Sequence, residues 1–242
     1  MTSRKRLDHA LTELGITSRL EEARKYVLAG RITVNGRVAI APSQTVFPPS
    51  DISLKSQPDY YGRGGNKLAH AIHDFELDLK GLIALDIGSS TGGFTHCLLK
   101  HDVSKVYSLD VGYGQLDYRL REDPRVTVME RINASYPFEI DEKVNIITVD
   151  VSFISLTRIL SSVSEHLAKE GIILALIKPQ YEARPDEIGK GGIVRSPSSH
   201  ADIIGRIISW VVGNGFRLRG LIASRITGSG GNREFFLMLN KL

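Results

Sequence analysis

The feature that most constrains the fold is the regular alternation of strand and helix patterns from Asn66 to the C-terminus. Short apolar runs, each with the length of a buried strand, are separated by segments whose apolar residues recur at helical spacing. This alternation is typical of an α/β fold, in which helices cover both faces of a mainly parallel sheet. The expected strands are 82–87, 106–109, 126–129, 144–149, 172–177, 217–224 and 234–239, and the expected helices lie around 68–75, 94–99, 156–167 and 203–212.

The connection between the last two expected strands is the short run Gly228-Ser229-Gly230-Gly231-Asn232. A crossover helix between parallel strands needs a dozen or more residues, so these two strands are expected to pair antiparallel. The result is a seven-stranded, Rossmann-like sheet of the kind usual in adenosylmethionine-dependent methyltransferases.

Composition places the chain among globular proteins. The 242 residues, 42% hydrophobic and 24% charged, fit one ordinary domain and a small second one, and they exclude a disordered or fibrous protein. Cys97 is the only cysteine, which predicts a reducing compartment and a cytoplasmic location. We recognise no secretory signal and no apolar run long enough to span a bilayer, so no membrane partner is expected.

Basic charge is concentrated at the N-terminus. Residues 1–40 hold eight basic and four acidic side chains, and this excess equals the net charge of +4 for the whole chain. A local positive excess favours a polyanionic partner, although a solvated basic surface explains charge alone equally well.

Residues 1–55 predict a small α+β domain. Leucines at helical spacing over 7–14 indicate a first helix, and Ser18 with Glu21 has the spacing of a capping box at the start of a second, which ends at Gly30. Asn35-Gly36 then predicts a two-residue hairpin turn. Residues 46–47 and 52–54 are expected to complete the small sheet.

The run from Ser18 to Gly36 resembles the RNA-binding domain named after ribosomal protein S4, and the resemblance covers residues 4 to about 55. It implies shape-led docking on structured RNA with basic side chains on phosphates. A protein–protein module that kept the same fold is the alternative. The candidate RNA-binding residues are Arg4, Arg6, Arg19, Arg24, Lys25, Arg31 and Arg37.

The segment Ser56-Gln57-Pro58-Asp59 is the expected boundary, which gives an S4-like domain at 1–58 and a methyltransferase domain at 59–242. The aromatic and Gly-rich run 60–65 that follows suits either contact with a nucleic-acid strand or a plain, flexible linker.

A Gly-rich turn after the first strand of the large domain predicts a cofactor site. Its pattern, G-x-x-x-G-G from Gly88, differs from the G-x-G-x-x-G of dinucleotide sites, and adenosylmethionine, which has no phosphate, needs a less tight turn. Asp110 ends the second strand, where a carboxylate can accept both ribose hydroxyls. Asn133 is either an adenine contact or a loop cap. The candidate cofactor-binding residues are Asp86, Gly88, Ser89, Ser90, Gly92, Gly93, Phe94, Asp110 and Asn133, and no spacing suggests a metal site.

Two lysines and two carboxylates are expected at the same edge of the sheet. Asp150 and Lys178 end strands, Glu234 begins the antiparallel strand, and Lys67 precedes the first strand. A ribose 2′-hydroxyl is a poor nucleophile, so methyl transfer to it needs its proton removed and its lone pair aimed. Lys178 is the candidate for this role, either as a base or by orienting the hydroxyl. The alternative is that these are ordinary surface and strand-end charges.

Six motifs resemble the TlyA family, also called the hemolysin A family. They are 64–68 (GGNKL), 86–95 (DIGSSTGGFT), 150–155 (DVSFIS), 177–180 (IKPQ), 189–195 (GKGGIVR) and 232–234 (NRE). The resemblance implies an rRNA 2′-O-methyltransferase that acts on cytidine in small- or large-subunit rRNA, with an FtsJ-like catalytic half. It places the family's catalytic tetrad at Lys67, Asp150, Lys178 and Glu234. The nucleotide, the ribosomal subunit and the oligomeric state stay open.

Three rival functions stand beside this one, and no residue pattern supports the first of them. The hemolysin name suggests a membrane-active protein, and the basic N-terminus suggests a non-catalytic RNA-binding factor in ribosome assembly. A nicotinamide-dependent oxidoreductase is the third. The loop 179–197, with Arg184, Lys190 and Arg195, is interpreted either as a lid that orders on RNA or as a disordered insertion.

Overall fold

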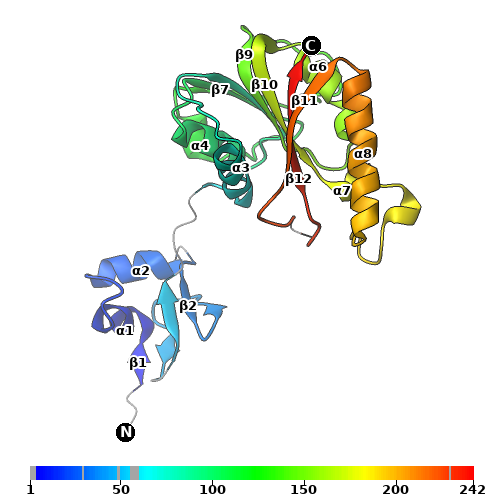
Figure 1. Cartoon of the computed structure of the whole chain (residues 1–242). Coiled ribbons are helices and arrows are strands. Elements are labelled where there is room, and N and C mark those ends of the chain that lie inside the picture. The colour runs from blue at the N-terminus through cyan, green and yellow to red at the C-terminus, as the bar shows by residue number, and fades with distance from the viewer. Residues whose placement is uncertain (1–3, 29, 48–49, 55–59, 229) are drawn as a thin grey trace. The chain divides into compact units, whose positions relative to one another are not determined.

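The chain divides into two compact units, Met1–Pro58 and Asp59–Leu242 (Figure 1). The computed structural model describes residues 4–28, 30–47, 50–54, 60–228 and 230–242. The expected domain boundary at 56–59 lies outside the described residues.

The described residues of the N-terminal unit form two helices and two small sheets. Helices α1 (Leu7–Glu13) and α2 (Leu20–Leu28) are followed by the sheet β3-β2-β5, in which β2 is Ile32–Val34, β3 is Arg37–Val38 and β5 is Ile52–Leu54. Asn35 and Gly36 have φ values of 50° and 75°, as the expected type I′ turn requires. The expectation that 46–47 would join this sheet is wrong, because β4 (Thr45–Val46) pairs with β1 (Lys5–Arg6) instead.

The cap of α2 differs from its expected form. Glu22, not Glu21, accepts hydrogen bonds from the backbone N–H and the hydroxyl of Ser18, at 3.1 and 3.2 Å. The helix begins two residues after Ser18, so the acid that faces back to Ser18 is one position later than expected. Gly30 has a φ of 67°, the left-handed conformation expected after the helix.

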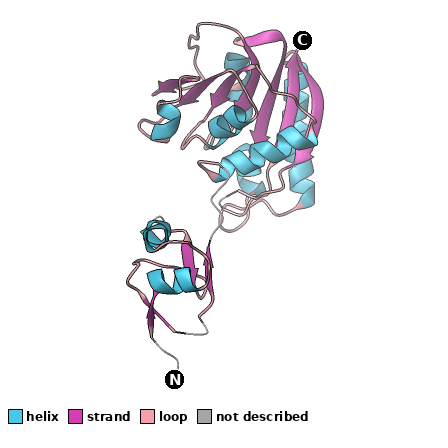
Figure 2. Cartoon of the chain, turned by 90° about the vertical axis from the view of Figure 1, so that its left-hand side faces the viewer, coloured by secondary structure: helices cyan, strands magenta, loops and turns pink. Residues whose placement is uncertain are grey.

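The large unit is built on one seven-stranded sheet in the order β11-β12-β10-β9-β6-β7-β8 (Figure 2). Only β12 runs antiparallel to its neighbours, which confirms the seven-stranded Rossmann-like methyltransferase arrangement. The strands are β6 (Ile83–Ile87), β7 (Lys105–Asp110), β8 (Val126–Glu130), β9 (Val144–Val149), β10 (Leu167–Ile177), β11 (Phe216–Ala223) and β12 (Phe235–Lys241).

Alternate residues of the strands bury their side chains on opposite faces of the sheet. On one face, Ala84 and Ile146 pack against α3 (Arg63–Asp74), α4 (Gly93–Lys100) and α5 (Tyr118–Arg121). On the other face, Leu85 and Ile147 pack against the 3-10 helix η1 (Leu156–Arg158), α6 (Leu160–Ser164) and α8 (Pro197–Gly213). Helices therefore cover both faces of the sheet.

Three elements depart from the sequence expectations. The helix expected over 156–167 is short, because β10 already begins at Leu167 and passes an irregular register before Ile172. Helix α8 begins six residues earlier than expected, since Ser196 caps it and Pro197 takes its first turn. Helix α3 begins at Arg63, so Lys67 lies in its second turn.

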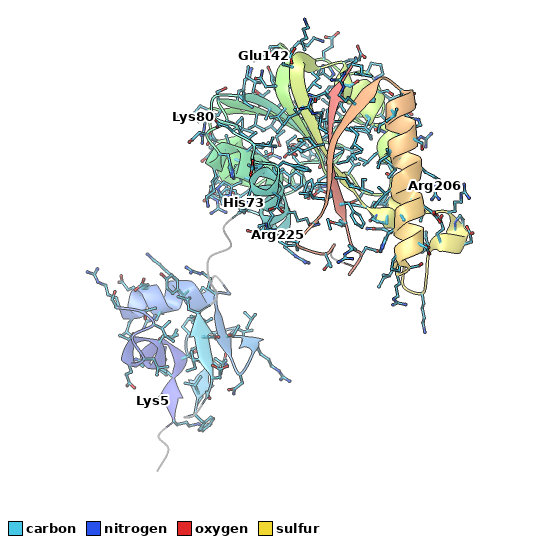
Figure 3. The ribbon with its side chains drawn as sticks, viewed as in Figure 1. Lys5, His73, Lys80, Glu142, Arg206 and Arg225 are labelled. Atoms are coloured by element: carbon cyan, nitrogen blue, oxygen red, sulfur yellow. The ribbon has the colours of Figure 1, made fainter. Side chains whose placement is uncertain are left out.

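The segment 60–65 is packed against the large unit, which contradicts its interpretation as a flexible linker. The Tyr61 ring stacks on His96 with centroids 3.9 Å apart, and a Cβ added to Gly65 would lie 2.3 Å from the Tyr60 side chain. The connection between β11 and β12 is also tied to α3, because the Arg225 guanidinium donates to the Asp74 carboxylate (Figure 3). Among the described residues, no helix has the length and apolar character needed to cross a bilayer.

Candidate active site

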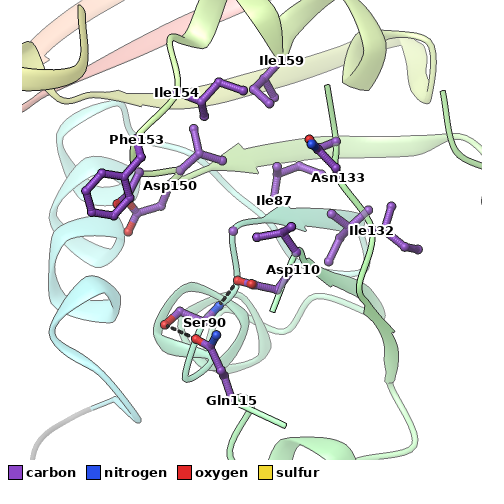
Figure 4. A pocket seen from close by; sticks show the side chains of 16 residues that line it. Ile87, Ser90, Asp110, Gln115, Ile132, Asn133, Asp150, Phe153, Ile154 and Ile159 are labelled. Atoms are coloured by element: carbon purple, nitrogen blue, oxygen red, sulfur yellow. Dashed lines mark hydrogen bonds between the residues drawn. The ribbon is translucent and has the colours of Figure 1, made fainter. Parts of the chain in front are cut away.

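A cavity of about 490 Å³ lies beside the carboxyl ends of β6, β7 and β9. Its walls are largely apolar, with Ile87, Leu109, Ile132 and Ile159 among them (Figure 4). Polar groups enter it from Asp110 and Asp150. A flat heteroaromatic group and a polar sugar together match such a lining.

The Gly-rich turn brings its backbone against the next strand end. Gly88 has a φ of 81°, and a Cβ there would lie 2.6 Å from the backbone oxygen of Asp150. Gly92 has a φ of 94°, and a Cβ there would lie 2.1 Å from a methyl group of Leu120. Only glycine fits both positions. The backbone of the turn can therefore pack closely against Asp150 and Leu120 without filling the cavity.

Asp110 is fixed by two backbone donors. Its Oδ2 atom accepts a hydrogen bond from the Ser90 N–H at 2.8 Å, and Oδ1 accepts one from the Gly112 N–H at 2.7 Å (Figure 4). The carboxylate lines the cavity in a fixed orientation, where its remaining lone pairs can accept further hydrogen bonds. The residues present therefore fit an adenosyl group, with the ribose hydroxyls at Asp110 and the base between apolar walls.

Asp86 does not line the cavity, although the sequence suggested a cofactor contact. It is fully buried under the turn, where its two oxygens accept hydrogen bonds from the Thr95 hydroxyl at 2.7 Å and the Thr148 hydroxyl at 2.8 Å. Burial raises the pKa of Asp86 to about 7, against the opposing effect of these hydroxyls. Asp86 thus joins β6, α4 and β9 beneath the loop.

The other candidate cofactor residues divide between two cavities. Gly88, Ser90 and Asn133 line the large one. Ser89, Gly93 and Phe94 line a smaller one of about 130 Å³, which shares Gly88, Ser90 and Asp150 with the first. Gly92 lines neither cavity. The side-chain oxygen of Asn133 accepts from the Ser135 N–H and hydroxyl, so this residue caps its loop as well as lining the cavity.

Lys67 and Glu234 form a buried ion pair with Nζ and Oε2 2.5 Å apart. Their side chains are 9% and 2% exposed, and both are therefore removed from bulk water. Lys67 reaches the pair from α3, and Glu234 reaches it from the residue before β12.

Lys178 and Asp150 form the second ion pair, with Nζ and Oδ1 2.6 Å apart. The hydrogen bond of this ammonium goes to the Ser152 hydroxyl at 3.0 Å, and Asp150 Oδ1 accepts no hydrogen bond from a described residue. Its contact with Lys178 is therefore electrostatic.

The two ion pairs lie at the same end of the sheet. Asp150 follows β9 directly and Lys178 follows β10 directly. Lys178 and Glu234 are one step beyond the register pair Ile177–Phe235. Of the four residues, only Asp150 lines the cavity, and it lines both cavities.

The seven basic candidates of the N-terminal unit fall into three groups. Arg6 and Arg24 are held by the buried Asp8 at 2.8 and 3.3 Å, and the Arg6 hydrogen bond lowers the pKa of Asp8 to about 2. Arg31 lies over the Tyr26 ring and Arg4 over Phe47. The remaining three, Arg19, Lys25 and Arg37, are exposed and form no ion pair with a described residue.

Several residues at the site were missed from the sequence. Ser152 and Ile154 lie in the run 150–155, whose position after a strand was a sufficient signal. Gln115 also lines the cavity, and its side-chain oxygen lies 3.5 Å from the Ser90 hydroxyl, but it sits in a loop whose sequence gives no signal. In the described parts of the chain, no group of three or more His, Cys, Asp or Glu side chains is placed to hold a metal ion.

Comparisons with known proteins agree with this fold and site. Residues 60–241 match the family of FtsJ-like methyltransferases, and residues 5–51 match the S4 domain. The chain is 42% identical to "Putative rRNA methyltransferase YqxC" of Bacillus subtilis, with 99% of this chain and 87% of the relative covered. It is 35% identical to "16S/23S rRNA (cytidine-2′-O)-methyltransferase TlyA" of Mycobacterium tuberculosis, with 99% and 91% covered.

A solved structure gives the same result. The chain resembles "Putative hemolysin from Streptococcus thermophilus" with a TM-score of 0.76 and 36% identity, over 100% of this chain and 90% of that one. The matched regions, the sheet order and the Gly-rich cavity all lead to one assignment. The chain belongs to the FtsJ-like methyltransferase family, among the TlyA-type members that carry an S4 domain before the catalytic unit.

Proposed function

We propose that the protein uses S-adenosylmethionine to methylate the ribose 2′-hydroxyl of cytidine in ribosomal RNA. The observation that carries the proposal is the placement of two ion pairs, Lys67–Glu234 and Lys178–Asp150, at the end of the sheet where the cavity opens. One ammonium and one carboxylate in each pair give the site polar groups that can hold and steer a hydroxyl.

The cavity supports the cofactor part of the proposal. Asp110 would hold the ribose hydroxyls, and the glycines of the 88–93 turn would let the cofactor approach the backbone. When bound there, S-adenosylmethionine supplies an electrophilic methyl group. Asp150, which borders both cavities, places the Lys178 ammonium at the rim.

Lys178 is the proposed catalytic residue that contacts the acceptor hydroxyl. Its ammonium is fixed from two sides by Asp150 and Ser152, so its direction is set before RNA arrives. It serves either to accept the hydroxyl proton or to orient the oxygen lone pair. Lys67 and Glu234 line neither cavity, but their buried ion pair lies at the same end of the sheet, with Glu234 directly before β12, which pairs with the strand that Lys178 follows.

The N-terminal unit supports rRNA as the partner. Its S4 match and its exposed basic side chains suit docking on structured RNA through phosphates. The cytidine and the two ribosomal subunits come from the name of the Mycobacterium tuberculosis relative. A ribosomal substrate supports a cytoplasmic location for the protein.

Mapping of ribose methylation in rRNA by mass spectrometry tests the proposal. Cells with the gene should carry a 2′-O-methylcytidine that cells without it lack, and Lys178→Ala should fail to restore the mark. Identical methylation maps in the two strains would contradict the proposal. Lysis of red cells by detergent-free protein without S-adenosylmethionine would favour the membrane-active alternative. Full complementation of an assembly defect by Lys178→Ala would favour a non-catalytic factor.

A further inference from the structure

The loop after β9 is held at three points by the segment after β10. At the start of the loop, Lys178 contacts Asp150 and Ser152. In its middle, the Phe153 ring packs against Tyr181 with centroids 5.0 Å apart. At its end, Glu182 accepts hydrogen bonds from Ser155 and Leu156. Lys178, which carries the ammonium, and Glu182, which fixes the end of the loop, therefore belong to one short stretch, 178–182.

Glu182 makes both of its contacts with good geometry. Its Oε2 atom accepts the Ser155 O–H at 2.6 Å, and Oε1 accepts the Leu156 N–H at 2.7 Å. Leu156 begins η1, so this N–H is one of the donors that the start of a helical turn leaves without an internal partner. The Glu182 carboxylate thus accepts the free N–H at the start of η1 and holds the end of the loop 150–156 against α7 (Pro179–Glu182).

The position of Glu182 is unfavourable for a charge. The side chain is half-buried, burial raises the pKa of its carboxyl group, and no Lys, Arg or His in the described residues lies within ion-pair distance of it. Glu187, five residues later, is instead paired with Arg206 at 2.6 Å (Figure 3). The charge of Arg206 opposes this rise in the pKa but does not cancel it. A half-buried acid that forms no ion pair with a described residue costs free energy, which indicates that the contacts it makes have a use.

The loop also holds a conformation that needs support. Phe153 has a φ of 65°, in the left-handed region that a bulky residue rarely adopts, and its side chain is 88% exposed. Its own burial therefore contributes little to this conformation. Contacts at both ends of the loop must hold it.

We propose that Glu182 is a positioning residue for methyl transfer, which holds the loop 150–156 so that Asp150 and Ser152 keep the Lys178 ammonium directed at the acceptor hydroxyl. The inference rests on the proposed function, and it adds a residue outside the four that the resemblance to the TlyA family named. Because Glu182 touches neither cavity in the described structure, its effect passes through Asp150 and Ser152.

Single-turnover methylation by the full-length protein tests this role. Glu182→Ala should slow the transfer step by roughly 10- to 100-fold, the size expected when a reacting group is misplaced by about 1 Å. The dissociation constants for S-adenosylmethionine and for RNA should stay within about twofold, since no contact with either is removed. A lower transfer rate with unchanged binding separates positioning from a general loss of folded protein.

Two conservative variants sharpen the result. In Glu182→Gln, the amide oxygen can accept the Leu156 N–H and the amide NH₂ can donate to Ser155, whose own proton can turn to the Thr157 hydroxyl at 2.8 Å. This variant should recover most of the rate. Glu182→Asp keeps the charge but is one methylene too short to make both contacts, so it should remain slow. If Glu182→Ala does not fold, the transfer rate of Glu182→Asp tests the positioning role instead.

Glu142→Ala is the matched control. Glu142 also accepts two side-chain hydrogen bonds, from Lys105 at 2.8 Å and Tyr107 at 3.1 Å, but it precedes β9 at the opposite end of the sheet (Figure 3). Its transfer rate should equal that of the wild type. An active wild type with an equally active Glu182→Ala and Glu182→Asp overturns this inference alone. A wild-type protein that methylates no rRNA overturns both the inference and the proposed function.

Discussion

Lys67 and Glu234 are 167 residues apart in the chain, yet their charged atoms meet at 2.5 Å in the interior of the catalytic unit. Because both side chains are more than nine-tenths buried, removal of either one leaves an unpaired charge without water. Glu234→Ala should lower the free energy of unfolding by about 3–5 kcal/mol. Urea denaturation followed by circular dichroism measures this loss.

The double variant Lys67→Met/Glu234→Leu is the control for that prediction. With both charges replaced by apolar groups of similar volume, most of the lost stability should return, while methyl transfer should stay absent. Equal losses in the single and double variants would show that the loss does not come from an unpaired buried charge.

Lys178→Ala should reduce methyl transfer by about 10²- to 10⁴-fold, the range usual for loss of a group that moves or holds a proton. Cofactor affinity should persist, since Lys178 does not line the cavity. Transfer of a radiolabelled methyl group to rRNA, with calorimetric titration of S-adenosylmethionine, measures the two effects. Loss of both together would place Lys178 in cofactor binding instead.

Asp110→Ala should weaken cofactor binding, in contrast to Lys178→Ala, which should leave it intact. The carboxylate held by the Ser90 and Gly112 amides would be lost, and with it the acceptor for the ribose hydroxyls. Loss of hydrogen bonds to a charged group, worth about 1.5–3 kcal/mol each, should weaken cofactor binding at least tenfold. Calorimetry measures the affinity. Nicotinamide dinucleotide serves as a comparison ligand, and tighter binding of it than of S-adenosylmethionine would contradict the assignment.

Asp86 gives the catalytic unit a predictable pH dependence. Burial raises its pKa in the folded protein from the ordinary value of 3.8 to about 7. Between about pH 4 and 7 the folded state therefore binds the proton that the unfolded state has lost. Stability should therefore fall as pH rises through this window, with a slope approaching about 1.4 kcal/mol per pH unit, and should level off above it. Asp86→Asn should flatten the curve. An unchanged slope in that variant would mean that other groups cause it.

Substitutions of the basic residues in the N-terminal unit should affect either RNA binding alone or also stability, depending on whether the residue has an ion-pair partner. Arg19, Lys25 and Arg37 are exposed without ion pairs to described residues, so their combined change to alanine should reduce the slope of log Kd for RNA against log salt by roughly 2–3. Arg24→Ala removes a contact to the buried Asp8, so it should also lower the stability of the N-terminal unit. Fluorescence anisotropy over a salt series measures the first effect and thermal melting the second.

The sequence predicted the sheet well because its strands are short apolar runs in a fixed alternation with helices. It also placed Asp150, Lys178 and Glu234 correctly at strand ends, since the position of a residue after a strand fixes the edge that it faces. The sequence did not show whether a side chain at a strand end points into the cavity or into the protein interior. Asp86 was expected at the cofactor, but its side chain points into the interior, where Thr95 and Thr148 come from two other elements.

Tertiary contacts explain the other misses. Nothing in the run 60–65 reveals that His96 and Gly93, some thirty residues later, pack against it and make it rigid. The role of Glu182 could not be predicted from the sequence either, because its two donors precede it by 26 and 27 residues. Pairing between the four charged residues required coordinates, as spacing alone does not say which lysine meets which acid.

The contact between Gly65 and Gly93 has a consequence for how the protein can change. A Cβ on Gly65 would lie 2.8 Å from the Gly93 oxygen, and one on Gly93 would lie 2.9 Å from the Gly65 nitrogen, so the first turns of α3 and α4 meet backbone to backbone. The helix that carries Lys67 and the turn that opens α4 are therefore in direct backbone contact, with no side chain between them. A shift of the turn that opens α4 would therefore press directly on the backbone of α3, the helix that carries Lys67.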